Sequence, residues 1–121
     1  MIAGVGMVAA APIPASSVVV RFVEPVVAPA GFGGLNHSCD PTLGWTDDRT
    51  LVALDDIPAG TELTADYSTA IADPDYLLWC HCGTYRCRQV IEGGDWRIPQ
   101  LQQRYAGHWH PAVQTLIEQA G

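Results

Sequence analysis

The chain has 121 residues, enough for one domain with a single hydrophobic core and too few for two. Its net charge of −7, from thirteen acidic residues against six arginines and no lysine, disfavours direct binding to nucleic-acid phosphates and favours basic protein partners. No apolar run reaches the roughly 18 residues that a membrane-spanning helix needs. Composition thus indicates a globular domain that neither binds nucleic acid directly nor enters a membrane.

The N-terminal stretch, residues 1–17, is rich in alanine and superficially resembles a signal peptide. It has no basic residue before Arg21, however, and several glycines and prolines interrupt it. We therefore expect these residues to be part of the folded domain, with processing as the alternative. Gly4 and Gly6 flank Val5 in an apolar setting, where the backbone can approach a ligand or simply turn.

Three short β-strands are predicted in the first half of the chain. Residues 17–23 are rich in valine, residues 50–54 are a short apolar run, and residues 61–67 alternate between side-chain classes at the period of a strand. Prolines at 24–30 predict an extended or irregular segment, and the composition of 55–60 predicts a turn.

Between the first two strands, residues 36–41 (Asn-His-Ser-Cys-Asp-Pro) follow a glycine-rich run. Their composition predicts a tight, non-helical loop, because these residue types favour turns and proline biases the residue before it toward extended geometry. Loops carry function more often than packing. This one brings together an amide from Asn36, an imidazole from His37 and a thiol from Cys39, which we take as candidate functional groups.

The four cysteines fall into two groups: Cys39 in this loop, and Cys80, Cys82 and Cys87 close together later in the chain. Four thiolates are what a closed tetrahedral zinc site needs, and Gly83 gives the backbone freedom to wrap around an ion. Disulfide pairing is the alternative; it requires a secreted protein, and the Cys-x-Cys spacing is unfavourable for it. The spacing favours zinc, which would join the loop to the later turn.

Arg86 and Arg88 flank Cys87 in this turn. A four-thiolate zinc site carries excess negative charge, and neighbouring cations offset it. We therefore expect both arginines to compensate the charge of the cluster, and the glycine pair at 93–94 to break the chain after it.

The rest of the chain is predicted to be a connector at 69–79 and helices at 98–106 and 112–120. The helices have apolar residues at helical spacing, and Pro111 suits a first helical turn. We expect them to be packing elements. The chain as a whole is predicted to be mostly β, with C-terminal helices.

Three motifs together resemble those of SET-domain protein-lysine methyltransferases with a post-SET zinc motif. They are residues 36–41, residues 60–67 (Gly-Thr-Glu-Leu-Thr-Ala-Asp-Tyr), and residues 80–83 (Cys-His-Cys-Gly) with Cys87 and Arg88. Residues 4–9 and 13–15 are similar to the family's opening glycine motif, so the resemblance covers about residues 2–96.

The resemblance implies a minimal, bacterial SET domain of small curved β-sheets, with a knot-like C-terminal segment and a zinc-binding post-SET turn. It divides the chain into a SET core at 1–79, a post-SET zinc segment at 80–96 and a helical tail at 97–121. These boundaries are expectations drawn from the family.

The implied activity is S-adenosylmethionine-dependent methyl transfer to a lysine side chain. Gly4, Gly6, Asn36 and His37 would hold the cofactor, partly through main-chain groups, and Tyr67 would be the catalytic tyrosine at the mouth of a narrow lysine channel. One structural zinc ion would be shared by Cys39, Cys80, Cys82 and Cys87.

The chain departs from the family's pattern in three places. Ala65 stands where an aromatic residue is common, which leaves room in the channel and leaves the number of transferred methyl groups open. Thr42 stands where the family often has asparagine. The stretch between Glu24 and Asp40 lacks the usual longer insert and its tyrosine. A second subunit would supply the missing groove wall, so a homodimer is expected; a zinc-stabilised binding module without activity is the alternative.

The implied partner is a Lys-rich segment of a basic protein such as a histone or histone-like protein, and the implied location is the cytoplasm, with chromatin or nucleoid-associated proteins as targets.

Asp66 faces away from Tyr67 at strand period and is expected to be structural. Four tryptophans are expected to be core or dimer contacts: Trp45, Trp79, Trp96 and Trp109.

Overall fold

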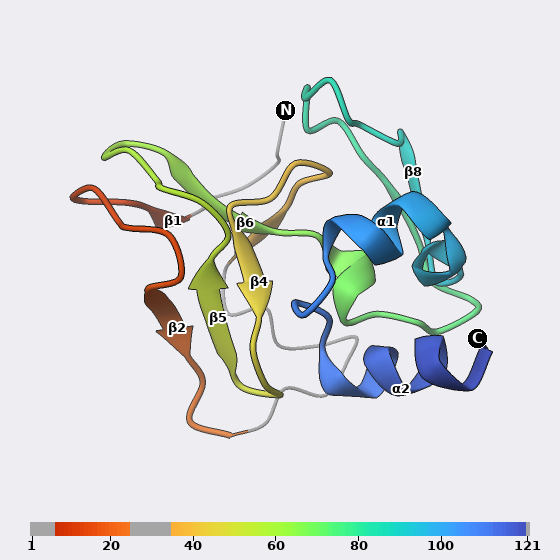
Figure 1. The fold of residues 1–121 in the computed structure, drawn as a ribbon. Helices are drawn as coiled ribbons and strands as arrows, with labels where there is room; N and C mark the ends of the chain where they lie inside the picture. Colours follow the sequence, from red (N-terminus) through yellow and green to blue (C-terminus); the bar gives the residue numbers. More distant parts are fainter. Residues whose placement is uncertain (1–6, 25–34, 121) are drawn as a thin grey trace.

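The computed structural model describes residues 7–24 and 35–120 (Figure 1). The candidate cofactor residues Gly4 and Gly6 lie outside these ranges. The prediction of a mostly β fold with C-terminal helices is confirmed. In chain order, the elements are β1 (Met7–Val8), β2 (Val18–Arg21), β3 (Asn36–His37), β4 (Leu43–Trp45), β5 (Thr50–Ala53), β6 (Glu62–Ala65), the 3-10 turn η1 (Tyr67–Thr69), β7 (Leu77–Trp79), β8 (Val90–Glu92), the 3-10 turn η2 (Asp95–Arg97), α1 (Pro99–Arg104) and α2 (Pro111–Ala120). Neither α1 nor α2 is long and apolar enough to cross a bilayer.

The main sheet has the strand order β1-β6-β4-β5-β2, with β3 pairing separately with β6. β6 is antiparallel to β1 and parallel to both β3 and β4. At its last residue, Ala65, it is in register with His37 of β3 and Leu43 of β4. Segments far apart in the sequence are therefore brought together just before Tyr67.

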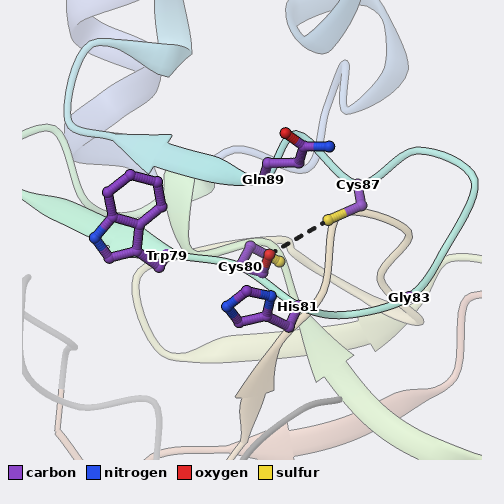
Figure 2. A pocket seen from close by; sticks show the side chains of 6 residues that line it. All are labelled: Trp79, Cys80, His81, Gly83, Cys87 and Gln89. Carbon is purple, nitrogen blue, oxygen red and sulfur yellow. Dashed lines mark hydrogen bonds between the residues drawn. The ribbon is translucent and has the colours of Figure 1, made fainter.

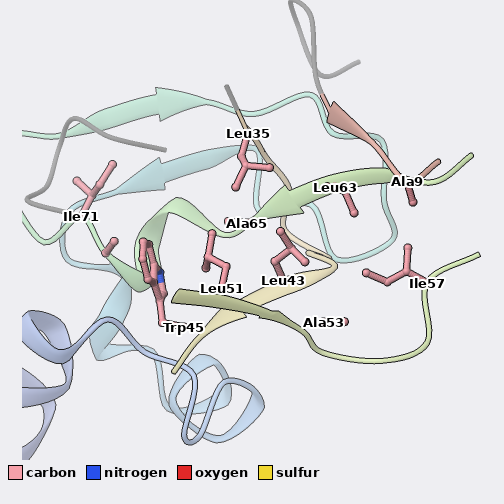
Figure 3. Packing of buried hydrophobic residues seen from close by; sticks show 11 residues of the cluster. Ala9, Leu35, Leu43, Trp45, Leu51, Ala53, Ile57, Leu63, Ala65 and Ile71 are labelled. Carbon is pink, nitrogen blue, oxygen red and sulfur yellow. The ribbon is translucent and has the colours of Figure 1, made fainter. Parts of the chain in front are cut away.

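The core of this sheet is filled by aliphatic side chains around one tryptophan (Figure 3). Trp45 is completely buried, and its indole nitrogen donates to the Thr69 hydroxyl at 3.1 Å. Trp96 and Trp109 are buried in a second cluster, as expected of core residues, whereas Trp79 is 67% exposed. The first cluster consists of Ala9, Leu35, Leu43, Trp45, Leu51, Ala53, Ile57, Leu63, Ala65, Ala70 and Ile71.

The strands at 17–23 and 50–54 are found close to their predicted positions, but the third strand is shorter than predicted. It ends at Ala65, because the side chain of Asp66 accepts a hydrogen bond from the Ser68 amide and begins η1. The predicted loop at 36–41 starts with a short strand, β3, and the predicted connector at 69–79 ends with one, β7.

The C-terminal part packs against the sheet as a second hydrophobic cluster. Figure 1 shows both helices on the same side of the sheet, with α2 beginning at Pro111 as predicted. The amide of His110 donates to the carbonyl of Thr69 at 2.9 Å, which ties the start of α2 to η1. Leu101, Tyr105 and Val113 are buried in this cluster. The helices are the packing elements that the sequence predicts.

The β7–β8 hairpin offers a stability test with a built-in control. A Cβ on Gly93 would lie 1.6 Å from the carbonyl oxygen of Asp73, whereas a Cβ on Gly94 would meet nothing within 4 Å. We expect Gly93→Ala to lower the free energy of unfolding by about 3 kcal/mol or more, because the backbone must shift to make room. Gly94→Ala should change it by less than about 0.5 kcal/mol. Urea unfolding followed by tryptophan fluorescence measures both, and equal midpoints would contradict the packing described here.

Candidate functional site

β3 places two candidate cofactor residues beside the end of β6. Asn36 is in parallel register with Thr64, and His37 with Ala65. The Asn36 side chain is half-buried, and its amide nitrogen donates to a carboxylate oxygen of Glu62 at 2.7 Å. The sheet thus holds the Asn36 side chain and fixes β3 next to the strand that leads into the candidate catalytic tyrosine.

His37 links the tyrosine to the cysteine cluster. Its buried imidazole accepts the backbone N–H of Tyr67 at Nδ1, at 3.0 Å, and its Nε2 lies 3.4 Å from Sγ of Cys39. Burial lowers the pKa of His37 to about 4, so the ring is neutral at physiological pH. Because Nδ1 accepts, the single ring proton belongs on Nε2, from which it is donated to the Cys39 sulfur.

Tyr67 is half-buried at the first position of η1. Its hydroxyl donates to the carbonyl oxygen of Leu35 at 2.5 Å, and its ring meets the His37 ring edge to face, with centroids 5.3 Å apart. Burial, with a smaller contribution from Tyr76, raises the pKa of Tyr67 above its usual value. The phenol therefore stays protonated at neutral pH and keeps its hydrogen bond to Leu35.

The four cysteines come together as a candidate metal centre, and their sulfur atoms all lie within 4.8 Å of one another. Tetrahedral zinc with Zn–S bonds of about 2.3 Å places its sulfurs about 3.8 Å apart. The observed distance between Sγ of Cys39 and Sγ of Cys80 is 3.8 Å. The number, type and spacing of these ligands therefore fit a structural zinc ion.

Hydrogen-bond donors surround the sulfurs. Besides His37, the backbone amide of Arg88 donates to Sγ of Cys39 at 3.3 Å, and the hydroxyl of Thr84 lies 3.3 Å from Sγ of Cys82. Such donors favour the thiolate form that a metal requires. They support the reading of the cluster as a ligand set.

The thiols differ in acidity. Burial raises the pKa of Cys39 above its usual range and that of Cys80 to about 11. Burial also acts to raise the pKa of Cys82, but hydrogen bonds from Thr84 and from backbone groups outweigh it and bring the value to about 6. A bound cation would therefore be what holds the sulfurs of Cys39 and Cys80 as thiolates near neutral pH.

The metal-candidate cluster lies under a surface pocket, shown in Figure 2. Cys80 and Cys87 line it, and the Cys87 thiol donates to the carbonyl oxygen of Cys80 at 3.6 Å. The pocket gives an ion a short path from solvent to the sulfurs, as a real metal site requires. Its other lining residues are Trp79, His81, Gly83 and Gln89.

The two arginines of the turn face carboxylates, and the charge of Arg88 also acts to lower the pKa of the Cys39 thiol, as expected of a cation that offsets the sulfurs. Arg86 lies 3.7 Å from a carboxylate oxygen of Asp40. The guanidinium of Arg88 donates to both carboxylate oxygens of Asp66, at 2.7 and 3.1 Å, and to Asp95 at 3.2 Å. The bidentate pair with a buried carboxylate fixes the orientation of the Arg88 guanidinium.

Asp66 is buried, in keeping with the structural role expected for it, but the sequence does not predict its partners. The hydroxyl of Tyr105 donates to it at 2.9 Å, across 39 residues of sequence. Tyr105 falls in the stretch 98–106, for which the sequence predicts only a packing helix. No sequence pattern near Tyr105 indicates that its hydroxyl contacts Asp66.

A model of the SET domain matches residues 29–68, a range that includes Asn36, His37, Cys39 and Tyr67. The chain is 33% identical over 76 residues to the H3 lysine-9 specific histone-lysine N-methyltransferase KMT1 of Fusarium mangiferae, a match that covers 47% of this chain and 22% of that protein.

Two further relatives carry similar names. The H3 lysine-9 specific histone-lysine N-methyltransferase dim-5 of Neurospora crassa is 36% identical over 78 residues, covering 47% of this chain and 24% of dim-5. The histone-lysine N-methyltransferase ash1 of Drosophila melanogaster is 34% identical over 74 residues, covering 55% of this chain and 3% of ash1. The chain thus spans about a quarter or less of the length of these relatives. The resemblance indicated by the three motifs is confirmed: the SET-domain model matches residues 29–68, the relatives are named histone-lysine N-methyltransferases, and the C-terminal cysteine cluster fits a post-SET zinc motif.

Proposed function

We propose that this chain is an S-adenosylmethionine-dependent protein-lysine N-methyltransferase. The observation that supports it most is the placement of Tyr67, whose backbone is held by His37 and whose hydroxyl is fixed on the Leu35 carbonyl. The relatives named histone-lysine N-methyltransferases support the same reaction class.

S-adenosylmethionine, when bound, supplies an activated methyl group for in-line transfer to an amine. Catalysis of such a step depends mainly on alignment, so the protein must hold the reacting nitrogen and exclude water. A dry channel also favours the neutral form of the lysine amine, which is the form that attacks.

Tyr67 suits the alignment role. Its hydroxyl donates its proton to the Leu35 carbonyl, and a phenol oxygen can accept as well as donate, so in this proposal it accepts a hydrogen bond from the incoming amine. Its raised pKa keeps it from acting as a base at neutral pH. In this proposal Tyr67 orients the amine, and the lysine loses its proton before it reaches the site.

Asn36 and His37 hold the cofactor through main-chain groups of β3. Both side chains already have partners inside the protein: Glu62 for Asn36, and Tyr67 and Cys39 for His37. Gly4 and Gly6, which lie outside the described residues, remain further cofactor candidates from the motif.

The four cysteines hold one structural zinc ion. In this role the ion takes no part in methyl transfer; it ties the segment that starts with β3 to the turn between β7 and β8. The cofactor-binding strand is then braced from its C-terminal side by Cys39.

The substrate is a Lys-rich segment of a basic protein, in keeping with the chain's net charge of −7. We further propose that a second copy of the chain supplies the groove wall that the short stretch before Asn36 lacks. The alternative function is that of a zinc-stabilised binding module that keeps the fold without the methyl-transfer activity. It is favoured by Ala65 and by the lack of a tyrosine in the short stretch between Glu24 and Asp40.

Calorimetry with S-adenosylmethionine, followed by transfer of a radiolabelled methyl group to a panel of basic proteins, tests the proposal. We expect saturable cofactor binding and label on lysine. Cofactor binding with no label on any protein of the panel would favour the binding module. Absence of cofactor binding would overturn both the cofactor assignment and the proposed reaction.

A further inference from the structure

Asp66 is a buried carboxylate on which three parts of the chain converge. It is 1% exposed and lies immediately before Tyr67. Arg88 from the zinc turn donates to its two oxygens at 2.7 and 3.1 Å, and Tyr105, which follows α1, donates to one of them at 2.9 Å. Its fourth donor is local, the amide of Ser68 at 3.0 Å.

The bond to Ser68 makes Asp66 the N-cap of η1, the turn that begins with Tyr67. The carbonyl of Asp66 also accepts the hydroxyl of Thr69 at 2.6 Å. The conformation of Asp66 therefore sets the start of the turn, and with it the direction in which the Tyr67 side chain leaves the backbone. A small rotation of the backbone at Asp66 therefore moves the hydroxyl at the far end of the Tyr67 ring by a larger distance.

Two distant donors keep that carboxylate in one place. Arg88 binds it bidentately, which fixes the plane of the carboxylate, and Tyr105 holds an oxygen from the helical side. The guanidinium is itself fixed, by Asp95 at 3.2 Å and by the Ser68 hydroxyl at 2.8 Å. Charge-assisted bonds in a buried setting are the strong ones, so this network is rigid.

The burial of Asp66 makes each donor matter. Burial alone would raise the pKa of Asp66, but hydrogen bonds and charge from Arg88 lower it below its usual range, so the carboxylate is ionised. A buried anion that loses a donor must find another or rotate. Removal of the Tyr105 hydroxyl takes away one of the donors to Oδ2 of Asp66 and leaves that of Arg88, next to the residue whose orientation the proposed reaction needs.

We propose that Tyr105 is a positioning residue that acts through Asp66 to hold Tyr67 in its reactive orientation. This inference rests on the proposed function, because it assigns to the helical tail a part in the alignment of the methyl acceptor. The tail would then complete the active site instead of only covering the sheet.

Tyr105 also packs, and the test must separate the two roles. Its ring meets Trp109 edge to face, with centroids 5.8 Å apart, inside the cluster around α1 and α2. Tyr105→Phe keeps this ring contact and removes only the hydroxyl. Val113→Ala is the matched control, because it loosens the same cluster while Val113 makes no side-chain hydrogen bond to Asp66.

We expect Tyr105→Phe to lower kcat roughly tenfold to a hundredfold, the effect of a small misplacement at a reacting group, while KM for S-adenosylmethionine and the zinc content stay unchanged. Val113→Ala should lower the melting temperature without this loss of kcat. A fall in melting temperature with wild-type kcat in both variants would overturn the proposal.

A spectroscopic measurement makes the test independent of activity. With tyrosine labelled at the ring carbon that bears the hydroxyl, the resonance of Tyr67 is identified by its loss in Tyr67→Phe. We expect it to shift or broaden in Tyr105→Phe and to stay in place in Val113→Ala. An unchanged Tyr67 resonance in Tyr105→Phe would reject the positioning role, even if the wild type transfers no methyl group. If the wild type is inactive but the Tyr67 resonance shifts in Tyr105→Phe, only the proposed reaction is rejected.

If Tyr105→Phe failed to fold, Arg88→Lys would serve in its place. Lysine keeps the charge beside Asp66 but cannot bind it bidentately. The same shift of the Tyr67 resonance and the same fall in kcat are expected, and their absence in a folded Arg88→Lys protein would count against the network as the element that positions Tyr67.

Discussion

Cys39→Ser is expected to remove zinc from the protein and, with it, to weaken binding of S-adenosylmethionine at least about tenfold. Cys39 is completely buried, and its sulfur lies between the His37 ring and the sulfur of Cys80. It takes hydrogen bonds from His37 and from the Arg88 amide and lies 3.8 Å from the Cys80 sulfur. Serine offers a poor zinc ligand, so the change breaks the link between the two segments.

The size of the metal effect follows from the chemistry of the site. Zinc binding to a structural cysteine site contributes roughly 10 to 16 kcal/mol at pH 7 in small zinc-binding domains, and losing one of four thiolates removes much of it. Metal analysis of the purified wild type should find one zinc ion per chain, and the zinc content of Cys39→Ser should be well below one ion per chain. Calorimetry on the same samples measures the cofactor affinity.

Cys82→Ser is the control for this experiment. Cys82 is a half-buried member of the same cluster, and its sulfur interacts with the Thr84 hydroxyl and with the backbone of Cys39, not with the His37 ring. Cys82→Ser should lose zinc as well but weaken the cofactor less, because the contact between His37 and Cys39 remains. Zinc loss in Cys39→Ser with full cofactor affinity would contradict the role of this cysteine as the link.

Tyr67→Phe is expected to lower kcat for methyl transfer by about 10² to 10³, the usual effect of removing one preorganised hydrogen-bonding group from a transition state. The variant keeps the ring and its contact with His37 but loses the hydroxyl that is fixed on Leu35. Cofactor affinity and zinc content should stay within about twofold of the wild type, because neither depends on this oxygen.

Tyr76→Phe is the matched control for the tyrosine. Tyr76 packs, half-buried, against the same hydrophobic cluster as Tyr67, so the loss of its hydroxyl tests the general effect of removing a phenol nearby. Single-turnover rates with saturating cofactor separate the chemical step from binding. Equal rates for Tyr67→Phe and the wild type would reject Tyr67 as the catalytic tyrosine.

Local patterns in the sequence predicted the parts of the fold that local chemistry decides. The apolar run at 50–54 forms β5, and Pro111 begins α2, because strand alternation and the missing amide of proline act within a few residues. The cysteine spacing predicted a single cluster across 41 residues, since few arrangements other than a metal site use four cysteines in this way.

The shortest strands lay beyond such patterns. β1, β3, β4, β7 and β8 have two or three residues each, too few to show the period of two that identifies a strand in a sequence. Their pairing is decided by partners elsewhere in the chain, such as Ala65, which is in register with both His37 and Leu43. The sequence accordingly predicted a loop and a connector where the structure has strand pairs.

The network at Asp66 lay beyond prediction for the same reason. Arg88 stands beside a zinc-candidate cysteine, so its charge was assigned to the metal, yet its guanidinium reaches a carboxylate 22 residues away. Nothing around Tyr105 distinguishes its hydroxyl from those of other tyrosines. Only the fold shows that both side chains end on the residue before Tyr67.

Methyl transfer to lysine is measured most directly as the mass of a Lys-rich basic protein after incubation with the purified chain and S-adenosylmethionine. We expect a mass gain of whole methyl groups, located on lysine by fragmentation, with the wild type and little or none with Tyr67→Phe. A zinc-loaded, cofactor-binding wild-type protein that leaves the mass of every basic protein in a broad panel unchanged would contradict it.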